Sequence, residues 1–193
     1  MASGSVAIIL AAGASQRMRT PKALLPWADT TLLGYTVQQA RAAGARQVVV
    51  ALGPATRHLT VTLDAVTVYN AEPETGRSAS ICLAAAAVED SPTAIVVQSV
   101  DQPVTADVLG RLYAAIDDKT DVAMPSFNGR RGHPICLAGR LLGELRTVTE
   151  QEQGLRAVVR RHADHVTEVL VDSESVLWNL NDPAAFAAAH ATS

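Results

Sequence analysis

Residues 6–13 read Val-Ala-Ile-Ile-Leu-Ala-Ala-Gly, an unbroken apolar run that closes on small side chains. A strand that is buried on both faces of a parallel sheet has a continuous apolar run rather than an alternating one. The stretch therefore predicts a buried strand at residues 6–10. We expect the loop after it to face a ligand, because ligands of open α/β sheets bind beyond the carboxyl ends of the strands.

Further along the chain, apolar strand-like runs alternate with segments of helical spacing. The runs lie at residues 47–52, 66–69, 94–97 and 122–125, and the helical segments at residues 32–43, 78–88 and 106–116. This alternation predicts βαβ units and a mainly parallel sheet. We expect an α/β fold with the three layers of a Rossmann-like sandwich, in a single domain that spans residues 1–193.

The carboxyl-terminal part of the chain departs from this alternation. Residues 129–139 combine a Gly/Arg-rich turn, a proline and a short apolar run, which predicts an antiparallel insertion and so a mixed sheet. Residues 151–162 are expected to form a helix and residues 167–171 a strand. A terminal helix is expected at residues 183–190, because proline is well tolerated in the first turn of a helix.

Composition narrows the classes of protein that the chain can belong to. Its 193 residues are 48% hydrophobic and only 4% aromatic, so the core must be aliphatic. The formal net charge of −3 argues against attraction of the whole molecule to nucleic acid or to an anionic membrane. Cys82 and Cys136 are too far apart for a CxxC site and are expected to be free thiols. No apolar run approaches the ~20 residues of a membrane span, so we expect a cytoplasmic protein.

The loop after the first predicted strand concentrates positive charge. Residues 10–22 read Leu-Ala-Ala-Gly-Ala-Ser-Gln-Arg-Met-Arg-Thr-Pro-Lys, with Arg17, Arg19 and Lys22 close together. Small residues let a ligand approach backbone N–H groups. From composition alone, a phosphate-binding loop and a solvated basic loop are equally good interpretations. The missing Gly-Lys-Ser/Thr ending excludes a P-loop, and the single glycine excludes a dinucleotide fingerprint.

This loop resembles the LAAGxSxRMGxxKxLLP motif of the MobA-like nucleotidyltransferases. Arg19 departs from the motif, because the family usually has glycine there. The Ala-Ala-Gly form and the run Leu25-Pro26-Trp27 are most similar to the molybdenum cofactor cytidylyltransferases. The resemblance covers residues 6–186 and implies a fold like that of the nucleotide-diphospho-sugar transferases. The matching residues are Leu10, Ala11, Ala12, Gly13, Ser15, Arg17, Met18, Lys22, Leu24, Leu25 and Pro26.

The resemblance implies where the nucleotide would bind. Arg17 and Lys22 would hold the triphosphate, and with Asp101 they would be the catalytic residues. Residues 75–81 match a Gly-x-Ser-x-Ser-Ile segment of the family, although a serine N-cap of a helix is an alternative interpretation of these residues. The implied nucleotide-binding residues are Leu10, Ala11, Ala12, Gly13, Ser15, Arg17, Lys22, Gly76, Ser78 and Ser80.

Three later segments imply a metal and an acceptor. Asp101 begins an Asp-Gln-Pro triplet like that of the cytidylyl group and would bind Mg²⁺, with Asn181 as a second contact where that group has aspartate. Asp182 before Pro183 is also a typical helix N-cap. An Arg-Gly-His-Pro segment would bind the acceptor through Arg131, Gly132 and His133, while a structural turn is the alternative for the histidine.

The implied activity is a Mg²⁺-dependent transfer of CMP from CTP to the phosphate of molybdopterin or its molybdenum form, with release of pyrophosphate. The expected partners are an NTP, a phosphorylated pterin and a molybdoenzyme that receives the product, and neither nucleic acid nor a membrane. Three alternatives stay open. One is GMP transfer to the same cofactor, another is nucleotidyl transfer to a different phosphorylated acceptor, and the third is an accessory protein that binds the cofactor without turnover.

Overall fold

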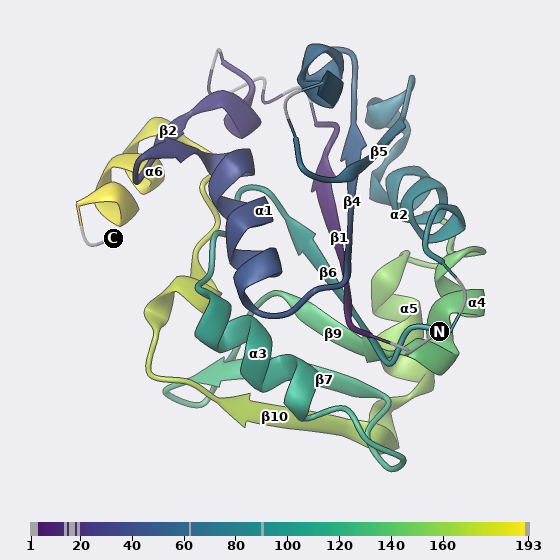
Figure 1. Ribbon diagram of the computed structural model, residues 1–193. Coiled ribbons are helices and arrows are strands. Elements are labelled where there is room, and N and C mark those ends of the chain that lie inside the picture. The colour runs from purple at the N-terminus through teal and green to yellow at the C-terminus, as the bar shows by residue number, and fades with distance from the viewer. Residues whose placement is uncertain are drawn as a thin grey trace.

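A computed structural model describes residues 4–13, 15, 18, 20–61, 63–89 and 91–191 (Figure 1). The described chain forms an eight-stranded sheet in the order β10-β7-β9-β6-β1-β4-β5, with β8 paired to β7. Its strands are β1 (Val6–Ala11), β4 (Gln47–Leu52), β5 (Val66–Tyr69), β6 (Ala94–Ser99), β7 (Val122–Phe127), β8 (Arg130–Arg131), β9 (Ile135–Ala138) and β10 (Val166–Leu170). A separate short hairpin joins β2 (Pro26–Trp27) and β3 (Thr30–Thr31).

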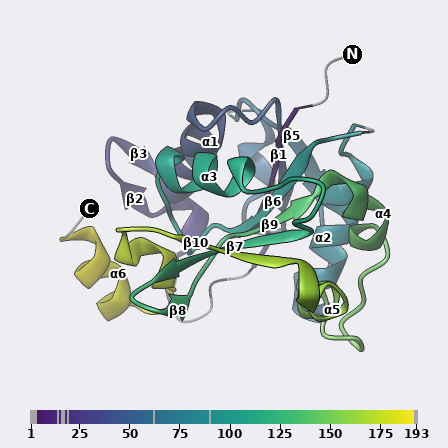
Figure 2. The same ribbon diagram turned by 90° about the horizontal axis from the view of Figure 1, so that it is seen from below.

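Helices cover both faces of the sheet, and this confirms the three-layer α/β fold. The α-helices are α1 (Leu32–Ala42), α2 (Arg77–Ala86), α3 (Ala106–Ala114), α4 (Leu142–Leu145), α5 (Leu155–Arg161) and α6 (Pro183–His190). Short 3-10 turns are η2 (Lys22–Leu24), η3 (Arg57–Val61), η4 (Pro73–Thr75), η5 (Gly139–Leu141), η6 (Ala163–His165) and η7 (Glu174–Leu177). Viewed along the sheet, α1 and α3 lie on one side, and α2 and α5 on the other (Figure 2).

The first strand is buried on both faces, as its unbroken apolar run predicts. Ala7 and Ile9 belong to the core beneath α1 and α3. Val6 and Ile8 belong to a second core beneath α2, α4 and α5. All four are fully buried. Each side chain on a strand points away from its neighbours, so only a strand between two helical layers needs apolar residues at every position.

The predicted antiparallel insertion is confirmed. β9 runs antiparallel to both β6 and β7, while β1, β4, β5 and β6 are paired in parallel, as are β7 and β10. β7 turns into β8 through Asn128 and Gly129, whose φ angles are 49° and 74°. Asn-Gly is the preferred pair for a two-residue hairpin turn in which both φ angles are positive.

The predicted helix at residues 151–162 is wrong at its start, because α5 begins only at Leu155. Gln153 and Gly154 have φ angles of 69° and 56°. A right-handed helix cannot pass through two consecutive residues in that conformation. The other predicted helices agree with the structure to within two residues at each end, and α6 has the predicted bounds. No helix in the described ranges is long and apolar enough to span a membrane.

Candidate functional site

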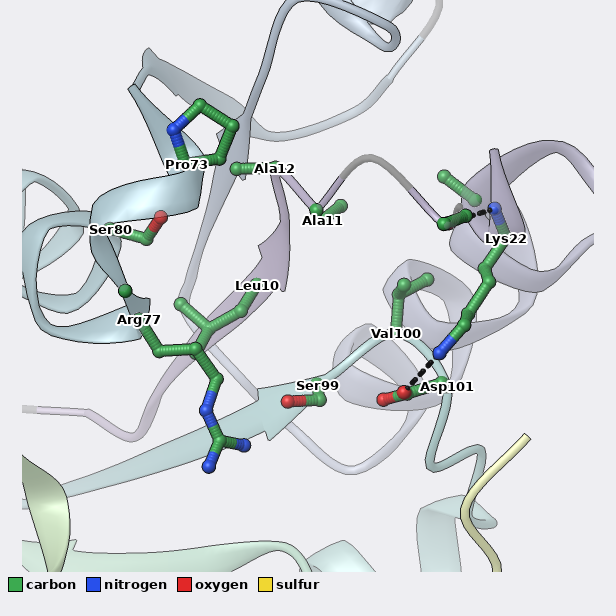
Figure 3. A pocket seen from close by; sticks show the side chains of 14 residues that line it. Leu10, Ala11, Ala12, Lys22, Pro73, Arg77, Ser80, Ser99, Val100 and Asp101 are labelled. Carbon is green, nitrogen blue, oxygen red and sulfur yellow. Dashed lines mark hydrogen bonds and ion pairs between the residues drawn. The ribbon is translucent and has the colours of Figure 1, made fainter. Parts of the chain in front are cut away.

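Two adjoining cavities open at the carboxyl ends of β1 and β6, where an open α/β sheet binds its ligands. The first has a volume of about 160 Å³ and is drawn in Figure 3. The loop after β1, the start of α2 and the loop after β6 enclose it. Its lining residues are Leu10, Ala11, Ala12, Gly13, Ser15, Lys22, Ala23, Pro73, Gly76, Arg77, Ser80, Ser99, Val100 and Asp101.

Lys22 forms the charged centre of this cavity. Its ammonium Nζ lies 2.7 Å from Asp101 Oδ2 and 2.5 Å from Asn181 Oδ1. The side chains of Lys22 and Asp101 are only 14% and 16% exposed, so solvent screens their attraction weakly. The Lys22 backbone N–H donates to Ser15 Oγ at 2.9 Å, which connects η2 to the loop after β1. The backbone N–H of Leu180 donates to the Asp101 carbonyl at 2.9 Å and so brings Asn181 to the centre.

The oxygens at this centre fit a hard divalent cation. The Asp101 carboxylate and the Asn181 amide oxygen both face the Lys22 ammonium, so a cation bound by both oxygens would take the place of that ammonium. Mg²⁺ prefers oxygen ligands, and it is typically held by one or two carboxylates together with substrate phosphates. Within the described ranges, no group of three or more His, Cys, Asp and Glu side chains could hold a metal ion. A cation at Asp101 and Asn181 would therefore complete its coordination from substrate and water.

The backbone around Ala12 and Gly13 provides the other end of the first cavity. A Cβ atom added at Gly13 would meet no heavy atom within 4 Å, so the backbone there is open to a ligand. Thr56 fixes this edge, since its Oγ1 donates to the Ala11 carbonyl at 3.1 Å and accepts from the Gly53 N–H at 3.0 Å. A Cβ at Gly53 would lie 2.2 Å from the Ala12 carbonyl oxygen. Sequence reasoning missed both Gly53 and Thr56.

The two serines that were predicted to bind the nucleotide, Ser78 and Ser80, both lie in the first turn of α2 but line different cavities. Ser80 lines the first cavity, and its hydroxyl accepts a hydrogen bond from Asn70 Nδ2 at 2.9 Å. Ser78 lines the second cavity. The alternative of a serine N-cap is wrong, because the N-cap residue is Gly76 and its φ is 122°.

A distant carboxylate takes the place of a capping side chain at α2. Glu150 Oε1 accepts the Ser78 backbone N–H at 2.6 Å. This hydrogen bond, together with the nearby charge of Arg77, lowers the pKa of Glu150. A carboxylate at a helix N-terminus satisfies a free N–H group and complements the helix dipole.

The second cavity is larger, about 440 Å³. It lies between α2, the turn before α5 and the strands β6 and β9. Leu10, Arg77 and Ser99 line both cavities. The remaining lining residues are Ser78, Ile81, Val97, Gln102, His133, Ile135, Glu150, Gln153, Gly154, Leu155, Arg156 and Asn179.

Of the three residues expected to bind the acceptor, His133 alone lines this cavity. Its backbone N–H donates to the Val176 carbonyl at 2.7 Å. Partial burial of the ring, with the charges of Arg77 and Arg156, lowers the pKa of His133 and so favours the neutral imidazole. Gly132 packs instead against backbone, because a Cβ there would lie 2.3 Å from the Val176 carbonyl oxygen.

Arg131 points away from both cavities. Its Nε donates to Glu168 Oε1 at 2.7 Å, across the pair of strands β8 and β10 that flank β7. Both side chains are substantially exposed, 55% and 39%, so this is a surface ion pair. Arg17, which the family resemblance places on the triphosphate, lies outside the described residues.

Sequence reasoning missed three charged residues of the second cavity. Arg77 occupies the variable position of the Gly-x-Ser segment, so the motif itself draws no attention to it. Glu150 and Arg156 lie in a stretch without any motif, and they reach the cavity because the turn before α5 folds against α2.

Comparisons with solved structures find the same fold in other proteins. Rv0371c from Mycobacterium tuberculosis H37Rv is 29% identical in sequence to this chain. The two structures superpose with a TM-score of 0.83, over 99% of this chain and 100% of Rv0371c. A structure of Rv0371C as a complex with manganese is 28% identical, has a TM-score of 0.78, and covers 99% and 100%. A nucleotidyl transferase from Methanothermobacter shares the fold at 22% identity, with a TM-score of 0.83 and coverage of 99% and 98%.

The search of curated proteins gave no match. The family model described as the MobA-like NTP transferase domain matches residues 7–166, which is most of the chain. The matched residues include Lys22 and Asp101, and also α2 and α5, which adjoin the second cavity. The protein therefore belongs to the family of MobA-like nucleotidyltransferases.

Proposed function

We propose that the protein transfers CMP from CTP to the phosphate of molybdopterin, or of its molybdenum form, in a reaction that requires Mg²⁺ and releases pyrophosphate. The observation that carries the proposal is the position of Lys22. Its ammonium group lies between the Asp101 carboxylate and the Asn181 amide oxygen, in a cavity whose other end is the open backbone of Ala12 and Gly13.

The residues of the first cavity suit the donor nucleotide. The N–H groups near Ala12 and Gly13 would bind the base and ribose, as the cytidylyl-type Ala-Ala-Gly loop suggests. The triphosphate would extend toward Lys22, whose positive charge offsets the charge that develops on the leaving pyrophosphate. Asp101 and Asn181 would hold a divalent cation, which would supply Lewis-acid stabilisation of the negative charge on the phosphates. The manganese in the Rv0371C complex supports a divalent metal in this family.

The second cavity suits an anionic acceptor. Arg77, Arg156 and His133 line it, next to the first cavity. An acceptor phosphate is already an anion at neutral pH and can attack the α-phosphorus in line, so the protein needs no nucleophile of its own. In such a reaction the protein contributes to catalysis by positioning the two phosphates and by neutralising their charge.

The Asn-x-Asn segment at residues 179–181 resembles the guanylyl group, but it does not argue for GTP here. Asn181 contacts Lys22 and Asn179 lines the second cavity, whereas the base is expected at the Ala12 end of the first cavity. We therefore retain CTP as the proposed donor. We also propose that the protein acts in the cytoplasm, where the free thiols Cys82 and Cys136 would stay reduced.

The decisive experiment measures pyrophosphate release with each of the four NTPs, with and without molybdopterin, in Mg²⁺ and in EDTA. We expect release with CTP, molybdopterin and Mg²⁺ together. Lys22→Ala and Asp101→Ala should each lower kcat by about 10²-fold or more, the effect of removing one charged contact to a transition state. Lys119→Ala is the matched control, because Lys119 is the only other lysine and is exposed far along the chain. Full activity of the Lys22 variant, or no turnover with any NTP, would refute the proposal.

A further inference from the structure

Arg77 occupies the boundary between the two cavities. Leu10, Ser99 and Arg77 line both of them, and Arg77 is the charged member of this group. In Figure 3 its side chain runs from the start of α2 past Leu10 toward Ser99, and its guanidinium ends on the side of the pocket that faces β6. A ligand in either cavity would therefore lie beside Arg77.

Arg77 and Arg156 provide positive charge at this boundary, and the Glu150 carboxylate lies near enough to Arg77 for the two charges to attract each other. Neither Arg77 nor Arg156 has an ion-pair partner among the residues that the structure describes. Glu150 is the carboxylate that faces them, and its Oε1 is already engaged by the Ser78 N–H. His133 and Arg156 also line the second cavity and add hydrogen-bond donors to it. The second cavity thus presents more positive than negative charge to a ligand.

We infer that Arg77 is a catalytic residue that contacts the phosphates of both substrates, whereas Arg156 contacts the acceptor phosphate alone. This inference rests on the proposed function, because it requires a donor phosphate in the first cavity and an acceptor phosphate in the second. Two anions must approach each other closely for the new phosphorus–oxygen bond to form. A guanidinium between them lowers their repulsion and can bind an oxygen of each through its fixed fork of donors. The class of acceptor that Arg77 and Arg156 would bind is a phosphate monoester.

Calorimetry can test the shared contact without turnover. The donor probe is an α,β-methylene analogue of CTP with Mg²⁺, and the acceptor probe is phenyl phosphate. Arg77→Gln should weaken the binding of both probes by roughly tenfold, the loss typical of one charge-assisted hydrogen bond. Arg156→Gln should weaken phenyl phosphate alone, and Arg77→Lys should retain part of both affinities. Arg111→Gln is the matched control, since Arg111 lies on α3 and is paired with Asp107.

The outcomes separate this inference from the proposed function. An affinity of Arg77→Gln within twofold of the wild type for either probe would overturn the shared contact, as would wild-type protein that does not bind phenyl phosphate. The predicted pattern of affinities in a protein that releases no pyrophosphate would support the contact and refute the proposed reaction. Where turnover is observed, Arg77→Gln should lower kcat by about 10²-fold even when both substrates are saturating. An unchanged kcat would show that Arg77 only binds.

Discussion

Gly53→Ala should damage nucleotide binding although Gly53 lines neither cavity. The added Cβ would lie 2.2 Å from the Ala12 carbonyl oxygen, 2.9 Å from its carbon and 3.0 Å from its Cα, whereas ordinary contacts begin at 3.4 Å. The Ala12 carbonyl or the Gly53 backbone must therefore move by about 1 Å. Gly53 cannot move freely, because its N–H donates to Thr56 Oγ1 at 3.0 Å and β4 is paired with β1 up to Ala11 and Leu52.

The shift should fall mainly on the loop that begins at Ala12. A displacement of about 1 Å at a substrate-positioning residue can lower the rate by about 10²-fold, and we expect a loss of that size in kcat/KM for the NTP. Forcing an extra methyl group into a packed site costs roughly 1–3 kcal/mol in the free energy of unfolding. Gly110→Ala is the matched control. Its Cβ would meet no heavy atom within 4 Å, so the variant should gain about 0.5–1 kcal/mol of stability and keep its activity.

The assays are pyrophosphate release, calorimetric titration with the methylene analogue of CTP, and urea denaturation of each variant. The denaturation experiment separates a displaced loop from an unfolded protein. The reasoning would be refuted if folded Gly53→Ala protein kept both its nucleotide affinity and its kcat/KM within about threefold of the wild type, since a displacement of about 1 Å should cost more.

Three further predictions follow from single contacts. Asn181→Asp should lower the Mg²⁺ concentration that gives half-maximal activity, because a carboxylate binds the ion more strongly than an amide does; an unchanged Mg²⁺ titration would contradict the assignment. The hydrogen bonds to Glu144 and Asp121 raise the pKa of His162 above 6.5. Its stabilising contribution is therefore complete below pH 6.5 and disappears as the pH rises through the raised pKa, so His162→Gln should destabilise the fold more at about pH 5.5 than at about pH 8.5 in urea denaturation. Asp182 caps α6 by accepting the Ala185 N–H at 2.9 Å; Asp182→Ala should cost about 1 kcal/mol in thermal unfolding, and Asp182→Asn, which retains an N-cap oxygen, should cost much less.

Hydrophobic patterning was sufficient to predict most of the helices and strands, because each of them depends on residues that are neighbours along the chain. The continuous run at residues 6–10 predicts a strand buried on both faces, and Val6 and Ile8 indeed belong to one core while Ala7 and Ile9 belong to the other. The pattern failed at residues 151–154, where apolar spacing carries no information about backbone angles. The positive φ angles of Gln153 and Gly154 keep the helix from beginning before Leu155.

The candidate site shows the same division between local and distant contacts. Lys22, Asp101 and the loop from Leu10 to Gly13 were predicted because each lies in a motif next to a strand. The cap of α2 could not be predicted, because Glu150 lies 72 residues from the Ser78 N–H group that it accepts. The assignment of Arg131 to the acceptor site depended on its neighbours in the sequence, while the pairing of β8 with β7 turns its side chain toward Glu168.

By itself, the sequence determined the succession of strands and helices along the chain, the loops expected to hold a nucleotide, and the resemblance to a nucleotidyltransferase family. Those properties reside in short stretches whose residues act together whatever the rest of the chain does. The tertiary structure alone decided that Asn181 meets Lys22 across 159 residues and that Arg77 lines both cavities. The reason is that such contacts depend on the order of strands in the sheet and on the packing of α2 and α5 against it, which no local pattern specifies.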